Sequence, residues 1–120
     1  MTNFDAETLS ALRDANEVLI RTEKHPANAV PIWVVVADGE VFVRSVRGTK
    51  GRWYRDLAVG GSATLEFAGQ RLAVQAIPAS DPAAIARASR EYLRKYSPSP
   101  YAQAMVRPDL LQTTLRLEPR

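Results

Sequence analysis

The chain has 120 residues, of which 46% are hydrophobic and 24% charged, and its formal net charge at pH 7 is +3. This balance argues against disorder and predicts one domain with one core over residues 1–120. The absence of cysteine excludes disulfides, thiolate metal sites, cysteine nucleophiles and iron–sulfur clusters, and it fits a cytoplasmic protein. No apolar run approaches the ~20 residues of a membrane span, and the first ten residues lack the pattern of a secretory signal.

The first third of the chain predicts a helix followed by two strands. Asp5 is a suitable N-cap for the helix, and Phe4 can pack on Leu9 across its first turn. Residues 17–23 alternate between apolar and polar side chains, as a half-buried strand does. Residues 32–37 are continuously apolar, which indicates one strand buried on both of its faces.

The middle of the chain predicts a hairpin, a loop and a short helix. Asp38-Gly39 is the strongest hairpin signal in the sequence, and it should join the apolar strand to a partner over residues 40–46. A basic loop follows, and a helix is expected over residues 53–58. Gly60-Gly61 then ends this helix.

The last half of the chain predicts a second hairpin, a longer helix and a final strand. Residues 63–67 and 72–77 should pair across the turn at Ala68-Gly69. Asp81-Pro82 is an N-cap followed by proline at the first helical position, so a helix should begin there and end near Tyr96. A short helical piece near residues 101–106 and a closing strand from Leu111 should follow.

Together these elements predict a mainly β, α+β fold with a six-stranded antiparallel sheet. Such a sheet has to bury one face on itself, and a small barrel does so. We expect an N-terminal helix, a short helix after the third strand and a longer helix before the last strand.

The basic loop at residues 45–52 is the leading candidate for a binding site. Its glycines allow the backbone to curl so that N–H groups point together and form a nest for an anion, beside the start of a helix. Countercharge and hydroxyl donors would come from Ser45, Arg47, Thr49, Lys50, Arg52 and Arg55. The alternative is an ordinary solvated connector, which composition alone slightly favours.

Three aromatic residues, Trp33, Trp53 and Tyr54, could line a flat pocket beside that loop. For Trp33, inside an apolar strand, a core position is the better interpretation. Trp53 and Tyr54 are adjacent on a helix and therefore point about 100° apart, so one of them should face a pocket or a subunit contact.

Catalytic and metal-binding constellations are not evident in the sequence. His25 is the only histidine and precedes Pro26 in a turn, so we expect an exposed loop residue with no role in a triad or a metal site. The carboxylates are scattered without the paired spacing of a hydrolase. The basic face of the late helix, with Arg87, Arg90 and Arg94, is better explained as solvated than as a nucleic-acid interface, and no membrane or nucleic-acid partner is expected.

The segment PIWVVVADGEVFVRSVRGTKGRWYRDL, residues 31–57, is similar to the core of split β-barrel proteins that bind flavin or deazaflavin, the pyridoxamine-phosphate-oxidase-like superfamily. It resembles most an uncharacterised branch, domain of unknown function 2255, near the deazaflavin-dependent nitroreductase family. The order of elements resembles this branch over nearly the whole chain, including the late helix ending near Tyr96 and the closing TTLRLEPR.

The resemblance implies a split-barrel homodimer with FMN or the deazaflavin coenzyme near the subunit interface. It implies phosphate contacts from the loop, a ring system beside the preceding strand, and closure of the site by the helix aromatics. The implied cofactor-binding residues are Pro31, Ile32, Trp33, Ser45, Arg47, Gly48, Thr49, Lys50, Gly51, Arg52, Trp53 and Tyr54.

Three functions stay open at this point. The first is an oxidoreductase that passes a hydride from the cofactor to a small-molecule substrate, with the cofactor supplying the chemistry and no catalytic residue expected. The second is a non-catalytic dimeric module that binds a cofactor, a haem-like ligand or a protein partner. The third and weakest is an anion or nucleic-acid binder that uses the basic loop and helix.

Overall fold

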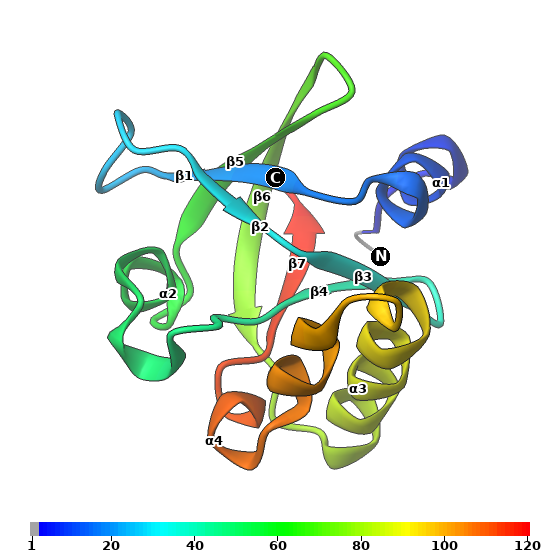
Figure 1. Cartoon of the computed structure of the whole chain (residues 1–120). Helices are drawn as coiled ribbons and strands as arrows, with labels where there is room; N and C mark the ends of the chain where they lie inside the picture. The colour runs from blue at the N-terminus through cyan, green and yellow to red at the C-terminus, as the bar shows by residue number, and fades with distance from the viewer. Residues whose placement is uncertain (1–2) are drawn as a thin grey trace.

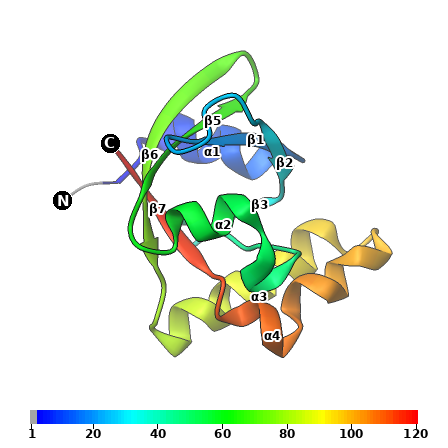
Figure 2. The ribbon, with the colours of Figure 1, turned by 90° about the vertical axis from the view of Figure 1, so that its left-hand side faces the viewer.

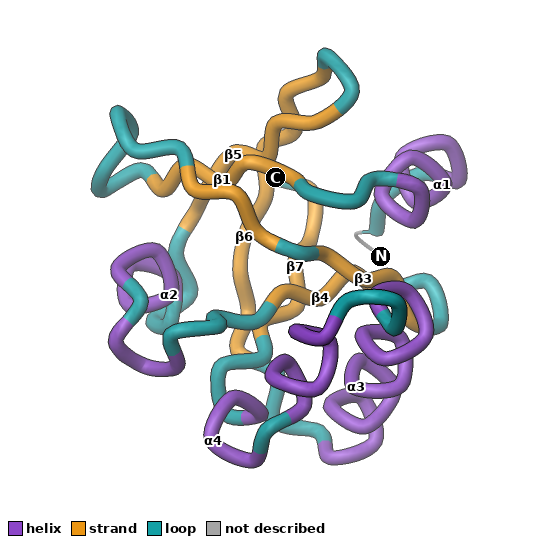
Figure 3. Tube along the Cα trace, viewed as in Figure 1, coloured by secondary structure: helices purple, strands orange, loops and turns teal. Residues whose placement is uncertain are grey.

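A computed structural model describes residues 3–120 of the chain, and its strands form one antiparallel sheet that curls into a nearly closed barrel with helices around it (Figure 1). The elements in chain order are α1 (Ala6–Asp14), β1 (Val18–Thr22), β2 (Val30–Ile32), β3 (Val34–Ala37), β4 (Glu40–Val43), the 3₁₀ helix η1 (Gly48–Lys50), α2 (Arg52–Leu57), β5 (Ser62–Phe67), β6 (Gln70–Pro78), α3 (Pro82–Tyr96), the 3₁₀ helix η2 (Pro100–Val106), α4 (Pro108–Leu111) and β7 (Leu115–Pro119). Figure 3 shows the strands at the centre and the helices at the periphery.

The described part of the sheet has seven strands rather than the six expected, because the apolar segment divides at Trp33. The strand order is β2-β1-β5-β6-β7-β4-β3, so the two edge strands are consecutive along the chain with Trp33 alone between them. β2 pairs with β1, and β3 pairs with β4. The barrel is therefore closed across this seam by the chain itself.

Side chains from helix α3 hold the chain at Trp33, where the strand changes partner. The Tyr92 hydroxyl donates to the Trp33 carbonyl oxygen at 3.2 Å, and the Val34 N–H donates to the Tyr96 hydroxyl at 3.3 Å. The Tyr96 ring also stacks on the Trp33 ring, with centroids 4.0 Å apart and planes 1° from parallel. These contacts give partners to the Trp33 carbonyl oxygen and the Val34 N–H where the strand pairing is interrupted.

Local signals in the sequence account for where the helices and the first hairpin begin. The Asp5 carboxylate accepts from the Thr8 N–H at 2.8 Å, and the Asp81 carboxylate accepts from the Ala83 N–H at 3.1 Å, so both predicted N-caps are confirmed. The predicted hairpin turn is confirmed too: Asp38 and Gly39 have φ values of 53° and 77°. Positive φ at both positions matches the twist of the strands that it joins.

Two hydrophobic clusters lie on the two faces of strand β3. Val34 and Val36 point into the barrel interior, whereas Val35 and Ala37 pack under α3 and η2. Both faces are buried, as the apolar run predicted. Trp53 and Leu57 bring helix α2 onto the barrel cluster, on a different side from α3 and α4 (Figure 2).

The end of the chain differs from the expectation in one respect. The last strand begins at Leu115 rather than near Leu111, because Pro108 starts the short helix α4 and the chain reaches the sheet only after it. Among the helices described for residues 3–120, none has the length and apolar character needed to cross a membrane.

Candidate functional site

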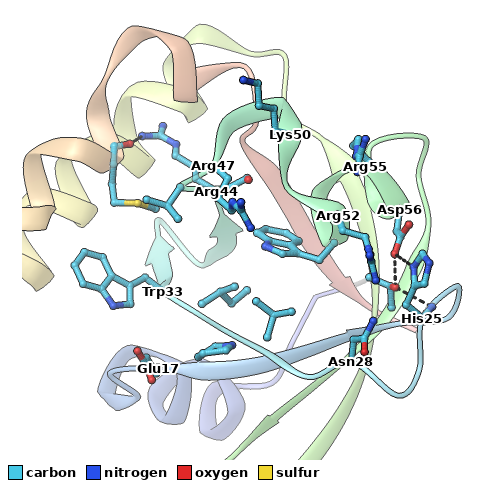
Figure 4. A pocket seen from close by; sticks show the side chains of 18 of the residues that line it. Glu17, His25, Asn28, Trp33, Arg44, Arg47, Lys50, Arg52, Arg55 and Asp56 are labelled. Carbon is cyan, nitrogen blue, oxygen red and sulfur yellow. Dashed lines mark hydrogen bonds and ion pairs between the residues drawn. The ribbon is translucent and has the colours of Figure 1, made fainter.

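A cavity of ≈ 690 Å³ opens beside the seam, where β1, β2, α2 and η2 come together (Figure 4). Four stretches of chain line it: the ends of β1 with the turn after it, β2 with Trp33, the segment from β4 into α2, and η2. The lining residues are Glu17, Thr22, His25, Asn28, Val30, Pro31, Ile32, Trp33, Arg44, Ser45, Val46, Arg47, Lys50, Arg52, Trp53, Arg55, Asp56, Tyr101 and Met105.

The basic loop at residues 45–52 borders this cavity, and part of its backbone is hydrogen-bonded within the loop. Three of its N–H groups are used within the loop: Gly48 donates to the Ser45 carbonyl, Lys50 to the Arg47 carbonyl and Gly51 to the Gly48 carbonyl. These bonds create the 3₁₀ turn η1. Those three donors are therefore taken within the loop, and its side chains supply the positive charge.

Four exposed cations surround the cavity on the side of this loop and helix α2. They are Arg47, Lys50, Arg52 and Arg55, and all four belong to its lining (Figure 4). Across residues 3–120 none of them pairs with a carboxylate. Their charge is therefore left for a ligand, which gives this part of the cavity a positive potential.

A fifth cation, Arg44, lies deeper and was not predicted. Its side chain is 1% exposed, and its guanidinium donates to four neutral acceptors: Thr114 Oγ1 (2.8 Å), Ser89 Oγ (3.0 Å), the Met105 carbonyl (3.0 Å) and the Ile85 carbonyl (2.8 Å). Burial lowers the pKa of Arg44 from its ordinary value. Arg44 thus ties the end of β4 to α3, η2 and the start of β7, and adds positive charge to the cavity wall.

Ser45 carries a buried hydroxyl that has no protein partner. The side chain is 1% exposed, lines the cavity, and its Oγ makes no hydrogen bond within the described chain. A Cβ at Gly51 would lie 2.5 Å from this Oγ, so glycine is what leaves the hydroxyl its space. Because buried polar groups normally have a partner, this hydroxyl is suited to a ligand oxygen.

Two indole rings lie on the cavity wall. Trp33 contributes from the seam, and Trp53 contributes from the first turn of α2. Trp53 is nearly buried, whereas Tyr54 turns away, with its hydroxyl 3.4 Å from the Gln112 carbonyl oxygen. The predicted divergence of these two neighbours is confirmed, and Trp53 is the one that faces the pocket.

His25 lies in the turn after β1 with its side chain 41% exposed, as expected, but it also contacts a carboxylate. Its Nδ1 lies 2.7 Å from Asp56 Oδ2, and the same oxygen accepts from Thr22 Oγ1 at 2.6 Å (Figure 4). Burial alone would raise the pKa of Asp56, but the hydrogen bonds from Thr22 and His25 lower it below the ordinary value. Asp56 is therefore a carboxylate that holds the turn after β1 against α2.

The structure brings together most, but not all, of the predicted cofactor-binding residues. Those that line the cavity are Pro31, Ile32, Trp33, Ser45, Arg47, Lys50, Arg52 and Trp53. Gly48, Thr49, Gly51 and Tyr54 are not part of the lining; the two glycines shape the loop instead. Lining residues outside the prediction include Thr22, His25, Arg44 and Asp56. Arg44 lay inside the strand predicted over residues 40–46, whereas β4 ends at Val43, and the one sequence signal for it was a cation among apolar strand residues.

Comparison with known proteins supports the fold. The sequence matches the family described as "Uncharacterized protein conserved in bacteria (DUF2255)" over residues 8–117. The crystal structure of the conserved hypothetical protein Rv2991 from Mycobacterium tuberculosis is similar with a TM-score of 0.62 and 14% identity, covering 96% of this chain and 78% of that chain. That of Campylobacter jejuni ChuZ gives 0.64 and 10%, covering 100% of this chain and 55% of ChuZ, so this chain spans about half of ChuZ. No curated protein matches the sequence significantly.

Proposed function

The chain belongs to the DUF2255 family, and from that premise we propose that it is a ligand-binding barrel whose cavity takes a flavin-type cofactor, either FMN or the deazaflavin coenzyme. The proposal extends to function as an oxidoreductase that passes a hydride to a small substrate. When bound, the cofactor would supply the redox chemistry, and the chain would supply the phosphate anchor, the ring contacts and the exclusion of water.

The observation that carries this proposal is the composition of one cavity. It combines unpaired cations, a buried hydroxyl without a partner and two indole rings within ≈ 690 Å³. That volume lies in the range of small-molecule and cofactor sites, about 300–1,000 Å³. A phosphorylated, planar aromatic ligand uses all three features.

The residues present fit such a group in distinct roles. Arg47, Lys50 and Arg52 would hold the phosphate, and arginine can bind its oxygens through two parallel hydrogen bonds. Ser45 would donate its unpartnered hydroxyl to a ligand oxygen. Trp53 and Trp33 would lie along the ring system, where aromatic surface is favourable for a planar ligand.

The test is a titration of tryptophan fluorescence with FMN and, separately, with the deazaflavin coenzyme. The chain has two tryptophans, so Trp33→Phe and Trp53→Phe each leave one reporter in the cavity wall. We expect saturable quenching by one cofactor in the wild type and from each remaining tryptophan. No quenching by either cofactor would refute the cofactor proposal.

Charge variants assign the phosphate anchor. Lys50→Ala and Arg52→Ala should each weaken cofactor binding about tenfold, equivalent to roughly 1.4 kcal/mol. Arg71→Ala is the matched control, because Arg71 is an exposed cation on the β5–β6 hairpin and outside the cavity lining. Equal affinities for the three variants would mean that the effect is one of net charge and not of a local anchor.

A homodimer is part of the proposal. Two rim residues of the cavity support it: Val46 is 58% exposed and Tyr101 is 71% exposed, which is high for apolar and aromatic side chains. A second copy that covers this rim would complete the site. Light scattering coupled to size exclusion tests it, and a monomer at all concentrations would contradict it.

The second function is a module that binds the ligand without turnover. It is favoured by the loop geometry, since the Gly48 and Lys50 N–H groups of η1 are bonded internally and the anchoring charges are on exposed, adaptable side chains. Cofactor binding with no transfer to nitroaromatic or quinone acceptors would establish this function in place of the oxidoreductase.

A further inference from the structure

The carboxylate–imidazole pair at the cavity is the feature that cofactor binding leaves unexplained. It is built from three parts of the chain: Thr22 at the end of β1, His25 in the turn after it and Asp56 in α2. Asp56 Oδ2 accepts from Thr22 Oγ1 at 2.6 Å and lies 2.7 Å from His25 Nδ1. All three residues line the cavity, and Figure 4 labels His25 and Asp56 among them.

The hydrogen bonds determine which nitrogen of His25 carries the proton. Asp56 is 9% exposed and ionised, so both of its partners must donate to it. His25 therefore keeps its proton on Nδ1 in the neutral form, and Nε2 is the atom that gains or loses a proton. In residues 3–120 Nε2 makes no hydrogen bond to the protein, and the side chain is 41% exposed, so a ligand and solvent can both reach the ring.

Charged groups of both signs surround this pair. Asp56 faces the His25 ring directly, and cations lie nearby. Lys24 acts on Asp56 from the same turn, Arg52 and Arg55 lie on α2, and Glu17 lines the same cavity. Arg21, which donates to the Pro26 carbonyl oxygen, pairs with Glu66, and Glu23 pairs with Arg120.

From this geometry we infer that His25 is the proton donor of the cavity and that Asp56, with Thr22, is its positioning residue; the inference rests on the proposed function. An electrophilic substrate that accepts a hydride from the reduced cofactor gains two electrons and one hydrogen, and is left with a negative charge on oxygen or nitrogen. His25 Nε2–H gives its proton to that atom, forming the O–H or N–H bond. The neutral imidazole then regains a proton from solvent.

This assignment narrows the substrate class. The substrate is an acceptor whose reduction consumes one hydride and one proton, such as a conjugated carbonyl, a quinone or a nitro compound. In the cavity lining, His25 is the only side chain whose ordinary pKa lies near neutrality, so it is the residue suited to this transfer.

The first test reads the tautomer without any turnover. Because the chain has one histidine, a long-range ¹H–¹⁵N spectrum of histidine-labelled protein contains the two nitrogens of a single ring. We expect the neutral ring to be protonated on Nδ1, and Asp56→Asn to move the proton to Nε2, since the amide can donate to Nδ1. Protonation on Nε2 in the neutral wild type would overturn the inference.

The second test separates the proton-donor role of His25 from the structural contact that its Nδ1 makes with Asp56 of α2. His25→Asn keeps an N–H close to Asp56 but removes the second nitrogen. With cofactor reduced in advance and 4-nitrobenzoate as the acceptor, its single-turnover rate should fall about 100-fold, in line with general acid catalysis. Its pH profile should flatten through neutrality, and its cofactor affinity should equal that of the wild type; Arg71→Ala should keep the wild-type rate and profile.

The outcomes distinguish two kinds of failure. Wild-type rate and pH profile in His25→Asn, with cofactor bound, would overturn the donor role and leave the proposed function in place. No binding of either cofactor to the wild type would remove the proposed function and the donor role together.

Discussion

Arg44 offers the sharpest test of what holds the cavity wall together. We consider Arg44→Met, which keeps the aliphatic stem but removes a buried charge with four hydrogen bonds to neutral acceptors. Each hydrogen bond from a charged donor contributes about 1.5–3 kcal/mol. The desolvation of the guanidinium opposes them by several kcal/mol.

The variant also leaves four acceptors without their donor, two of them backbone carbonyls. The net loss of stability should therefore be about 3–4 kcal/mol, because the lost hydrogen bonds and the unpaired acceptors outweigh the recovered desolvation. Urea unfolding measures it as a change in midpoint. With a slope of about 1.5 kcal/mol per molar urea, the midpoint should fall by roughly 2 M.

Arg116→Met is the matched control, because Arg116 is 30% exposed and pairs with surface carboxylates. Its loss should stay below about 1 kcal/mol. A loss below about 1 kcal/mol for Arg44→Met as well would refute the reasoning, since desolvation would then offset all four hydrogen bonds.

Three further outcomes are expected. Gly51→Ala should change the unfolding free energy by less than about 1 kcal/mol relative to the wild type, because φ of Gly51 is −64° and the Ser45 Oγ, 2.5 Å from the new Cβ, can rotate away. It should nevertheless weaken FMN binding as much as Ser45→Ala does. In the double variant, Gly51→Ala should cause no further loss of affinity beyond that of Ser45→Ala. Gly61→Ala should cost about 1–3 kcal/mol in urea unfolding, since its Cβ would meet the backbone carbonyl oxygen of Asp56 at 2.8 Å; an unchanged midpoint would contradict the packing. Burial lowers the pKa of Lys95 from 10.5 to about 8. Above pH 8 the unfolded chain therefore binds more protons than the native chain, and the unfolding free energy increases as the pH rises. Lys95→Met should remove that gain, as measured by urea midpoints across this pH range.

Local signals allowed much of the fold to be predicted from the sequence. The caps at Asp5 and Asp81 and the turn at Asp38-Gly39 depend on residues within three positions of one another, so they can be recognised without the rest of the chain. The division at Trp33 could not be, because its hydrogen-bonding partners lie 59 and more residues away in α3. That contact decides between one long strand and two short ones.

The same distinction applies to the site. The loop cations were predicted because charge is visible in sequence, and they do line the cavity. Three N–H groups of the loop are bonded to neighbouring carbonyls, and the predicted nest stays a prediction for the remaining N–H groups. The roles of His25 and Arg44 were missed because their hydrogen-bonding partners, Asp56 and Thr114, are 31 and 70 positions away in the sequence.

The seam at Trp33 also constrains how this chain can change in length. Residues 30–37 serve two ladders at once, one with β1 and one with β4, and a single residue joins them. An insertion or deletion here would shift one ladder by a residue and turn its buried side chains to the opposite face. The tip of the β5–β6 hairpin belongs to one ladder alone. Evolution and engineering can therefore lengthen the barrel at that hairpin, while the seam has to keep its length.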